Sequence, residues 1–123
     1  MSLSLLYPKQ YRDPWTYFAL LVGIDAYSTL HPLANCVADV KAMRDMLLDS
    51  GYPASNVVTT LNCTHTDLRA HVSAFTRLLD GAEGCHVLFF YAGHGVDGAG
   101  GEPILMPVDA DLSSDSGEAT EAG

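Results

Sequence analysis

The uninterrupted apolar run at residues 17–24 does most to limit what this chain can fold into. Its residues do not alternate between apolar and polar, so the run predicts a β-strand that is covered on both faces. Strands of this kind are typical of a parallel sheet that lies between two layers of helices. We therefore expect residues 17–24 to form a central strand of an α/β fold.

Strand and helix patterns alternate along the rest of the chain. Apolar residues recur at helical spacing over 37–47 and again over 68–79, and short apolar runs at 57–61 and 87–91 predict two further strands. Strands that alternate with helices in this way indicate right-handed crossovers and a parallel sheet, whose ligands bind beyond the carboxyl ends of the strands. The predicted architecture is a three-layer α/β/α fold with a mostly parallel sheet.

The predicted sheet has an open edge. If the strands are ordered second, first, third, then the strand that carries Leu88, Phe89 and Phe90 has a neighbour on one side only. Apolar edge strands pair with another strand or aggregate. The sheet is therefore expected to be incomplete at its third strand, and a partner strand is expected to complete it.

After the third strand we expect one short extended segment, at residues 104–106.

Sequence composition divides the chain into three parts. Residues 1–16 are predicted to be an irregular lead-in, 17–111 the folded domain and 112–123 an acidic, disordered tail. Six lysine and arginine residues against fifteen aspartate and glutamate residues give a net charge of -9, which disfavours binding to nucleic acid or to an anionic membrane surface. No apolar run approaches the roughly 18 residues that span a bilayer, and no secretion signal is recognisable, so a cytoplasmic protein is predicted.

The three cysteines, Cys36, Cys63 and Cys85, cannot all pair with one another. None of their spacings matches a C-x-x-C pattern, so reduced thiols are expected. Cys63 with His65, and Cys85 with His86, could contribute to a zinc site. Packing at strand ends is the preferred interpretation of both pairs, and we predict neither a metal ion nor a cofactor.

A histidine between two glycines, Gly93-His94-Gly95, follows the third predicted strand directly. There the imidazole would lie at the carboxyl edge of the sheet, available as a base, and the Gly95 amide could approach a substrate carbonyl oxygen and stabilise an oxyanion. A histidine that is only hydrogen-bonded at a strand end is the simpler alternative. Residues 93–98 also satisfy G-x-G-x-x-G, but residues 99–103 cannot form the helix that a dinucleotide site requires.

Four segments of the sequence carry a family resemblance, at residues 18–27, 33–39, 89–95 and 106–110. In their order and spacing they resemble caspase-like cysteine peptidases of the metacaspase and paracaspase branch. The resemblance covers roughly residues 17–111 and implies the large-subunit region of a cysteine-type endopeptidase that hydrolyses peptide bonds. It implies that His94 is the catalytic histidine and that Gly95 supplies the oxyanion amide.

The same resemblance implies a substrate pocket that is lined by Cys36, Asp39 and Ala92. A carboxylate at Asp39 would pair with an arginine or lysine before the scissile bond, so we expect basic specificity. Asp39 could equally favour the positive end of a helix dipole, and the two roles can coexist. Ala92 stands where related peptidases often carry serine, which removes one hydroxyl from the expected pocket.

The thiol that the resemblance requires is not among the later residues. In caspases the nucleophilic cysteine lies roughly 50 residues after the histidine, and no cysteine follows His94 in this sequence. Cys36 is expected at the same sheet edge, but lining the pocket or packing is favoured for it over acting as the nucleophile.

Three functions follow from these observations. The first is a peptidase that binds a peptide or protein substrate and is completed by a small-subunit region or partner strand. The alternative is a non-catalytic caspase-like interaction or regulatory module that recruits partners through the open strand. A third interpretation, a flavodoxin-like ligand binder, would require phosphate or flavin at residues 93–101.

Overall fold

The computed structural model of the chain describes residues 16–82 and 84–111. The predicted acidic tail at 112–123, and all of the predicted lead-in except Thr16, lie outside the described residues. None of the helices in the described part is long and apolar enough to cross a bilayer.

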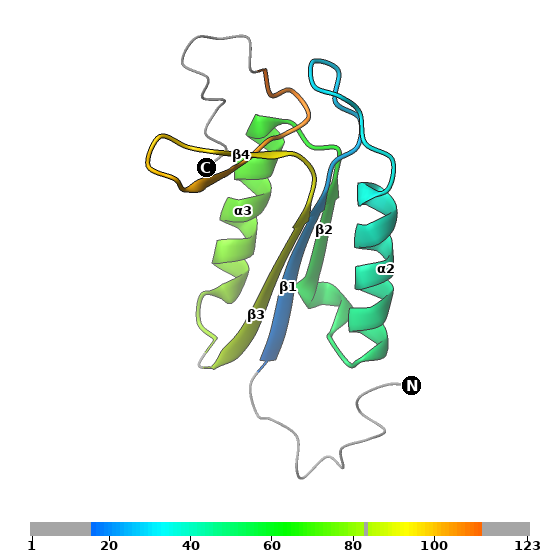
Figure 1. Cartoon of the computed structure of the whole chain (residues 1–123). Helices are drawn as coiled ribbons and strands as arrows, with labels where there is room; N and C mark the ends of the chain where they lie inside the picture. Colours follow the sequence, from blue (N-terminus) through cyan, green and yellow to red (C-terminus); the bar gives the residue numbers. More distant parts are fainter. Residues whose placement is uncertain (1–15, 83, 112–123) are drawn as a thin grey trace.

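A three-stranded parallel sheet forms the centre of the fold (Figure 1). Strand β1 (Thr16–Gly23) lies in the middle, between β2 (Val57–Leu61) and β3 (Cys85–Ala92). The side chains of β1 are buried from Phe18 onward, as expected for a strand covered on both faces. The predicted order of second, first and third strand is confirmed.

Two helices cover the two faces of the sheet, which confirms the predicted α/β class with its helical layers (Figure 1). Helix α2 (Cys36–Asp49) lies on one face, and helix α3 (His65–Leu79) lies on the other. A short 3₁₀ turn, η2 (Ala54–Asn56), leads into β2. The buried residues form a cluster on each face. On the α2 face these are Ala19, Leu21, Val40, Leu47 and Val57. On the α3 face they include Phe18, Leu20, Val22, Leu68, Phe75 and Met106.

A two-stranded antiparallel ribbon follows the sheet. Strand β4 (Gly95–Asp97) pairs with β5 (Pro103–Leu105), and the ribbon crosses beyond the carboxyl end of β3 (Figure 1). The sequence predicted only the second of these strands, at 104–106, one residue later than it is found. Strand β4 was missed because Gly95-Val96-Asp97 has too few residues to show an alternating pattern, and pairing with β5 decides its conformation.

Strand β3 forms an edge of the sheet within the described residues. Leu88 and Phe90 pack against the cluster on the α2 face. Val87 and Phe89 point to the other face and are 49% and 48% exposed. An edge strand with two half-exposed large apolar side chains matches the predicted incompleteness of the sheet at its third strand.

Candidate active site at the carboxyl edge of the sheet

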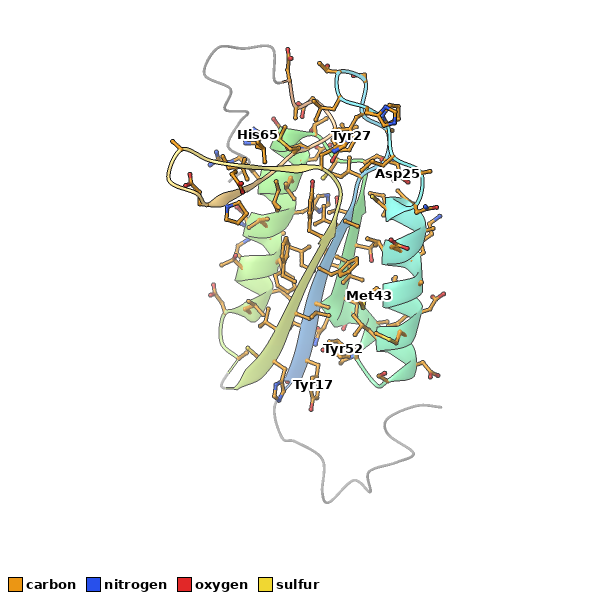
Figure 2. All side chains as sticks on the ribbon, viewed as in Figure 1. Tyr17, Asp25, Tyr27, Met43, Tyr52 and His65 are labelled. Atoms are coloured by element: carbon orange, nitrogen blue, oxygen red, sulfur yellow. The ribbon has the colours of Figure 1, made fainter. Side chains whose placement is uncertain are left out.

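The segments that follow β1 and β3 meet at the carboxyl edge of the sheet. Figure 2 shows Asp25 and Tyr27 at this end of the fold, whereas Tyr17 and Tyr52 lie at the opposite end. His94 follows β3 by two residues, and its imidazole contacts the Tyr27 ring with a centroid separation of 4.6 Å and an interplanar angle of 57°. The structure therefore brings the histidine to the loop after the first strand, as the sequence predicts.

The His94 imidazole is half-buried and hydrogen-bonded through one nitrogen. Its Nε2 atom lies 2.7 Å from the carbonyl oxygen of His31. A carbonyl oxygen can only accept a hydrogen bond, so Nε2 must carry a proton. In the neutral ring Nδ1 then has no proton, and no described residue hydrogen-bonds to it. The ring thus presents Nδ1 as its base nitrogen.

The peptide groups around His94 are held by two tyrosine hydroxyls. The His94 N–H donates to Tyr27 Oη at 2.9 Å, and Tyr91 Oη donates to the His94 carbonyl oxygen at 2.6 Å. Gly93 leaves the space for these hydroxyls, because a Cβ atom there would lie 2.6 Å from Tyr91 Oη and 2.8 Å from Tyr27 Oη. The glycine was predicted from the sequence, but the roles of the two tyrosines were not, because Tyr27 lies in a polar loop and Tyr91 in an apolar strand run, and neither position indicates a partner.

The Gly95 N–H points away from strand β5. On the ribbon, the Met106 N–H donates to the His94 carbonyl oxygen at 3.1 Å. Four residues after His94, the Gly98 N–H donates to the Glu102 carbonyl oxygen at 2.7 Å. Hydrogen-bonded and non-hydrogen-bonded positions alternate in an antiparallel pair, so Gly95 occupies a non-hydrogen-bonded position. Its amide is therefore directed outward, as an oxyanion donor requires.

The N-terminus of α2 is capped by a residue from the loop after β1. The Asp25 carboxylate accepts from the Cys36 N–H at 2.8 Å and from the Val37 N–H at 3.1 Å, while Asn35, at the cap position, makes no side-chain cap. Such a cap contributes about 1 kcal/mol. From the sequence, Asp39 was the residue expected at this end of the helix. Asp39 does lie in the first turn, exposed, but Asp25 is the capping residue.

The loop that contains Asp25 is hydrogen-bonded to Asn62, the residue that follows β2. Asn62 has a φ of 50°, in the left-handed region that asparagine tolerates. Its Oδ1 atom accepts from the N–H groups of Asp25 at 2.9 Å and Ala26 at 3.0 Å. Asn62 thus links the ends of β1 and β2, a role that was not predicted from the sequence.

The three predicted pocket residues lie around the end of β1. Ala92 is paired with Gly23 across the β1–β3 ladder. A Cβ atom on Gly23 would lie 2.9 Å from the Cys36 carbonyl oxygen, so Cys36 packs directly against this glycine. Asp39 lies one helical turn after Cys36. Gly23 therefore lies between Ala92 and the first turn of α2.

None of the three cysteines has the environment of an activated thiol. Burial raises the pKa of the Cys36 thiol, and the Asp25 and Asp39 carboxylates raise it further. Burial also raises the pKa of Cys63, which is 3% exposed. Cys85 begins β3 and so lies at the far end of the strand from His94. Catalytic cysteines need a lowered pKa, so packing is favoured over a nucleophilic role for Cys36 and Cys63, and its position excludes Cys85 as the partner of His94.

The two cysteine–histidine pairs considered for zinc are not assembled into a site. Among the residues that the structure describes, no three histidine, cysteine or acidic side chains come together as a metal centre would require. His86 instead stacks on Tyr17, with centroids 4.7 Å apart and an interplanar angle of 11°. The backbone N–H of His65 donates to Asp109 Oδ1 at 2.9 Å at the start of α3.

Comparison with known proteins agrees with this geometry. A family model described as the caspase domain matches residues 16–119. The human mucosa-associated lymphoid tissue lymphoma translocation protein 1 is 34% identical over 92 residues, which make up 75% of this chain and 10% of that protein. The chain thus spans about a tenth of the length of that relative. The chain belongs to the caspase domain family, which confirms the resemblance to caspase-like cysteine peptidases.

Proposed function

We propose that this chain is the large-subunit part of a cysteine endopeptidase and supplies the base and one oxyanion donor to the active site. The observation that carries the proposal is the arrangement of two adjacent residues. His94 holds a proton on Nε2 through the His31 carbonyl, which leaves Nδ1 as the base. The next residue, Gly95, directs its N–H away from the ribbon.

The proposed reaction is acyl transfer through a thioester. His94 Nδ1 takes the proton of a cysteine thiol, and the sulfur attacks the scissile carbonyl carbon. The carbonyl oxygen becomes an oxyanion, which the Gly95 N–H stabilises. The imidazolium then gives its proton to the leaving amine as the C–N bond breaks. Water, activated by the same nitrogen, hydrolyses the thioester and returns the thiol.

The thiol of this reaction comes from outside the 123 residues. No cysteine follows His94, and the raised pKa of Cys36 argues against that residue as the nucleophile. Strand β3 has no second neighbour among residues 16–82 and 84–111, so this edge offers a place for the complementing strand. A strand that paired in parallel with β3 would end at the same edge as His94 and could present a cysteine there.

The proposed substrate has arginine or lysine before the scissile bond. Asp39 lies exposed on the first turn of α2, and the net charge of -9 favours a cationic partner. The second carboxylate of this region, on Asp25, is occupied by the helix N–H groups. The Asp39 carboxylate is therefore the group that we expect to bind the basic side chain of the substrate. Free cysteines support a reducing compartment, which we take to be the cytoplasm.

The specificity is tested on the complete gene product, with fluorogenic peptides that differ only in the residue before the scissile bond. We expect cleavage after arginine and lysine and none after aspartate. Asp39→Asn should lower kcat/KM for the arginyl peptide by about tenfold, the scale of one charge-assisted hydrogen bond. The matched control is Asp45→Asn, an exposed aspartate farther along the same helix, which should leave the rate unchanged. Cleavage after aspartate, or equal rates for the two variants, would refute basic specificity.

A non-catalytic interaction module is the second candidate, and the exposed Val87 and Phe89 on the edge of β3 favour it. The same assay separates the two functions. A complete gene product that has no cysteine after His94 and cleaves none of the peptides would support the interaction module. Cleavage that requires a later cysteine would support the peptidase.

A further inference from the structure

Two tyrosine hydroxyls bridge the backbones of His94 and Met106, and the proposed reaction leaves them without a role. Tyr27 comes from the loop after β1 and is 4% exposed, and Tyr91 is the penultimate residue of β3. Their hydroxyl oxygens are 3.3 Å apart. Four backbone groups, the N–H and C=O of His94 and of Met106, all lie within hydrogen-bond distance of this pair.

Each hydroxyl has one proton, and the distances determine where it goes. Tyr27 Oη donates to the Met106 carbonyl oxygen at 2.7 Å and accepts from the His94 N–H at 2.9 Å. Tyr91 Oη donates to the His94 carbonyl oxygen at 2.6 Å and accepts from the Met106 N–H at 3.2 Å. The alternative acceptor for Tyr91, the Met106 carbonyl oxygen, is farther away, at 3.1 Å. Each tyrosine therefore joins a donor on one backbone to an acceptor on the other.

Both hydroxyls keep their protons at any working pH. Burial raises the pKa of Tyr91 far above its ordinary value, and the neighbouring Tyr27 hydroxyl raises it further. Burial also raises the pKa of Tyr27. An acid whose pKa is raised stays protonated over a wider range, so both groups remain hydrogen-bond donors.

The hydrogen bond from Tyr91 Oη to the His94 carbonyl oxygen fixes the direction of the Gly95 N–H, the proposed oxyanion donor. The carbonyl group of His94 and the N–H of Gly95 belong to one planar peptide unit and point in opposite directions. The carbonyl oxygen accepts from Tyr91 Oη at 2.6 Å and from the Met106 N–H at 3.1 Å. With its carbonyl held from two sides, the peptide unit cannot rotate, and the Gly95 N–H is aimed at the side away from Tyr91.

We propose that Tyr91, supported by Tyr27, is a positioning residue that aims and strengthens the Gly95 N–H as the oxyanion donor. This inference rests on the proposed function. The strengthening follows because a hydrogen bond to the carbonyl of a peptide unit polarises the N–H of the same unit. Tyr27 holds the same region from the other side, because its hydroxyl accepts from the His94 N–H and donates to the Met106 carbonyl oxygen.

The substitution that isolates this role is Tyr91→Phe. Phenylalanine keeps the ring and removes only the hydroxyl, so packing on β3 is retained. Outright loss of an oxyanion donor costs about 10²–10³ in kcat, whereas Tyr91→Phe keeps the donor and loosens its aim, so we expect a loss of about tenfold. The matched control is Tyr52→Phe, a tyrosine at the opposite end of the fold (Figure 2).

Two readouts separate positioning from a structural contribution. The first uses the complete gene product with arginyl peptide substrates and an arginyl peptide aldehyde, whose thiohemiacetal oxygen occupies the oxyanion position. Tyr91→Phe should lower kcat and weaken aldehyde binding by the same factor, with KM unchanged. The second uses amide NMR of the 123-residue chain. There, Tyr91→Phe should move the Gly95 N–H resonance upfield, while Tyr52→Phe leaves it in place.

The outcomes distinguish this inference from the proposed function. If the unsubstituted protein cleaves no peptide, the proposed function fails, while the Gly95 resonance still tests the positioning. If the unsubstituted protein is active and Tyr91→Phe matches it in kcat and in aldehyde affinity, the positioning role is refuted. An unmoved Gly95 resonance, or a change in KM alone, would refute it as well.

Discussion

Replacing His94 by alanine in the complete gene product is expected to lower kcat/KM for an arginyl peptide by about 10²–10⁴-fold, the range of general acid–base catalysis. The substitution removes Nδ1, the nitrogen that is proposed to take the proton of the thiol. Steady-state cleavage of the fluorogenic peptide measures the effect. The loss should appear in kcat, because the imidazole acts on protons that move during the reaction.

The control for this variant is His71→Ala. His71 lies on α3, away from the carboxyl edge, so its loss should leave the peptidase rate unchanged. Thermal unfolding should be similar for both variants, because the His94 ring is half-buried and makes one side-chain hydrogen bond. A His94→Ala protein that folds and cleaves the peptide at the original rate would contradict the role assigned to the imidazole.

Gly93→Ala is expected to lower the free energy of unfolding by about 1–3 kcal/mol, the usual cost of forcing extra atoms into a packed site. A Cβ atom at this position would lie 2.6 Å from Tyr91 Oη, 2.9 Å from Tyr91 Cζ and 2.8 Å from Tyr27 Oη. Gly93 has no positive φ, so the cost is steric rather than conformational. Denaturant unfolding with an unchanged m-value measures it.

The comparison for this variant is Gly95→Ala, where a Cβ atom would make an ordinary contact, 3.5 Å from the Ile104 carbonyl oxygen. Its unfolding free energy should stay close to that of the unsubstituted chain. In a Tyr91→Phe background, Gly93→Ala should cost less, because the nearest atom is gone, and a double-mutant cycle gives the coupling. Equal stability of Gly93→Ala and the unsubstituted chain would show that the two hydroxyls do not occupy the described positions.

The sheet and the position of the histidine could be predicted from sequence because each depends on a local pattern. The run at 17–24 is apolar without alternation, and the strand is buried on both faces. The motif around His94 follows a strand directly, so the carboxyl edge of the sheet was the only place for it. Patterns within one segment therefore sufficed for the architecture.

The hydrogen bonds that hold the site residues in place could not be predicted, because they join segments that are distant in the sequence. Tyr27 and His94 are 67 residues apart, yet their hydrogen bond places the histidine. The cap of α2 by Asp25 crosses 11 residues. A hydroxyl or carboxylate has no sequence period that reveals its partner, so these roles emerge only from the fold.

The most direct measurement of the central claim is the tautomer of the His94 imidazole. Long-range ¹H–¹⁵N NMR of the labelled chain distinguishes a proton on Nε2 from one on Nδ1. With His94 Nε2 bound to the His31 carbonyl oxygen at 2.7 Å, the neutral ring should carry its proton on Nε2 and leave Nδ1 as the acceptor. A neutral ring protonated on Nδ1 would contradict the account, because the nitrogen proposed to take the thiol proton would already hold one.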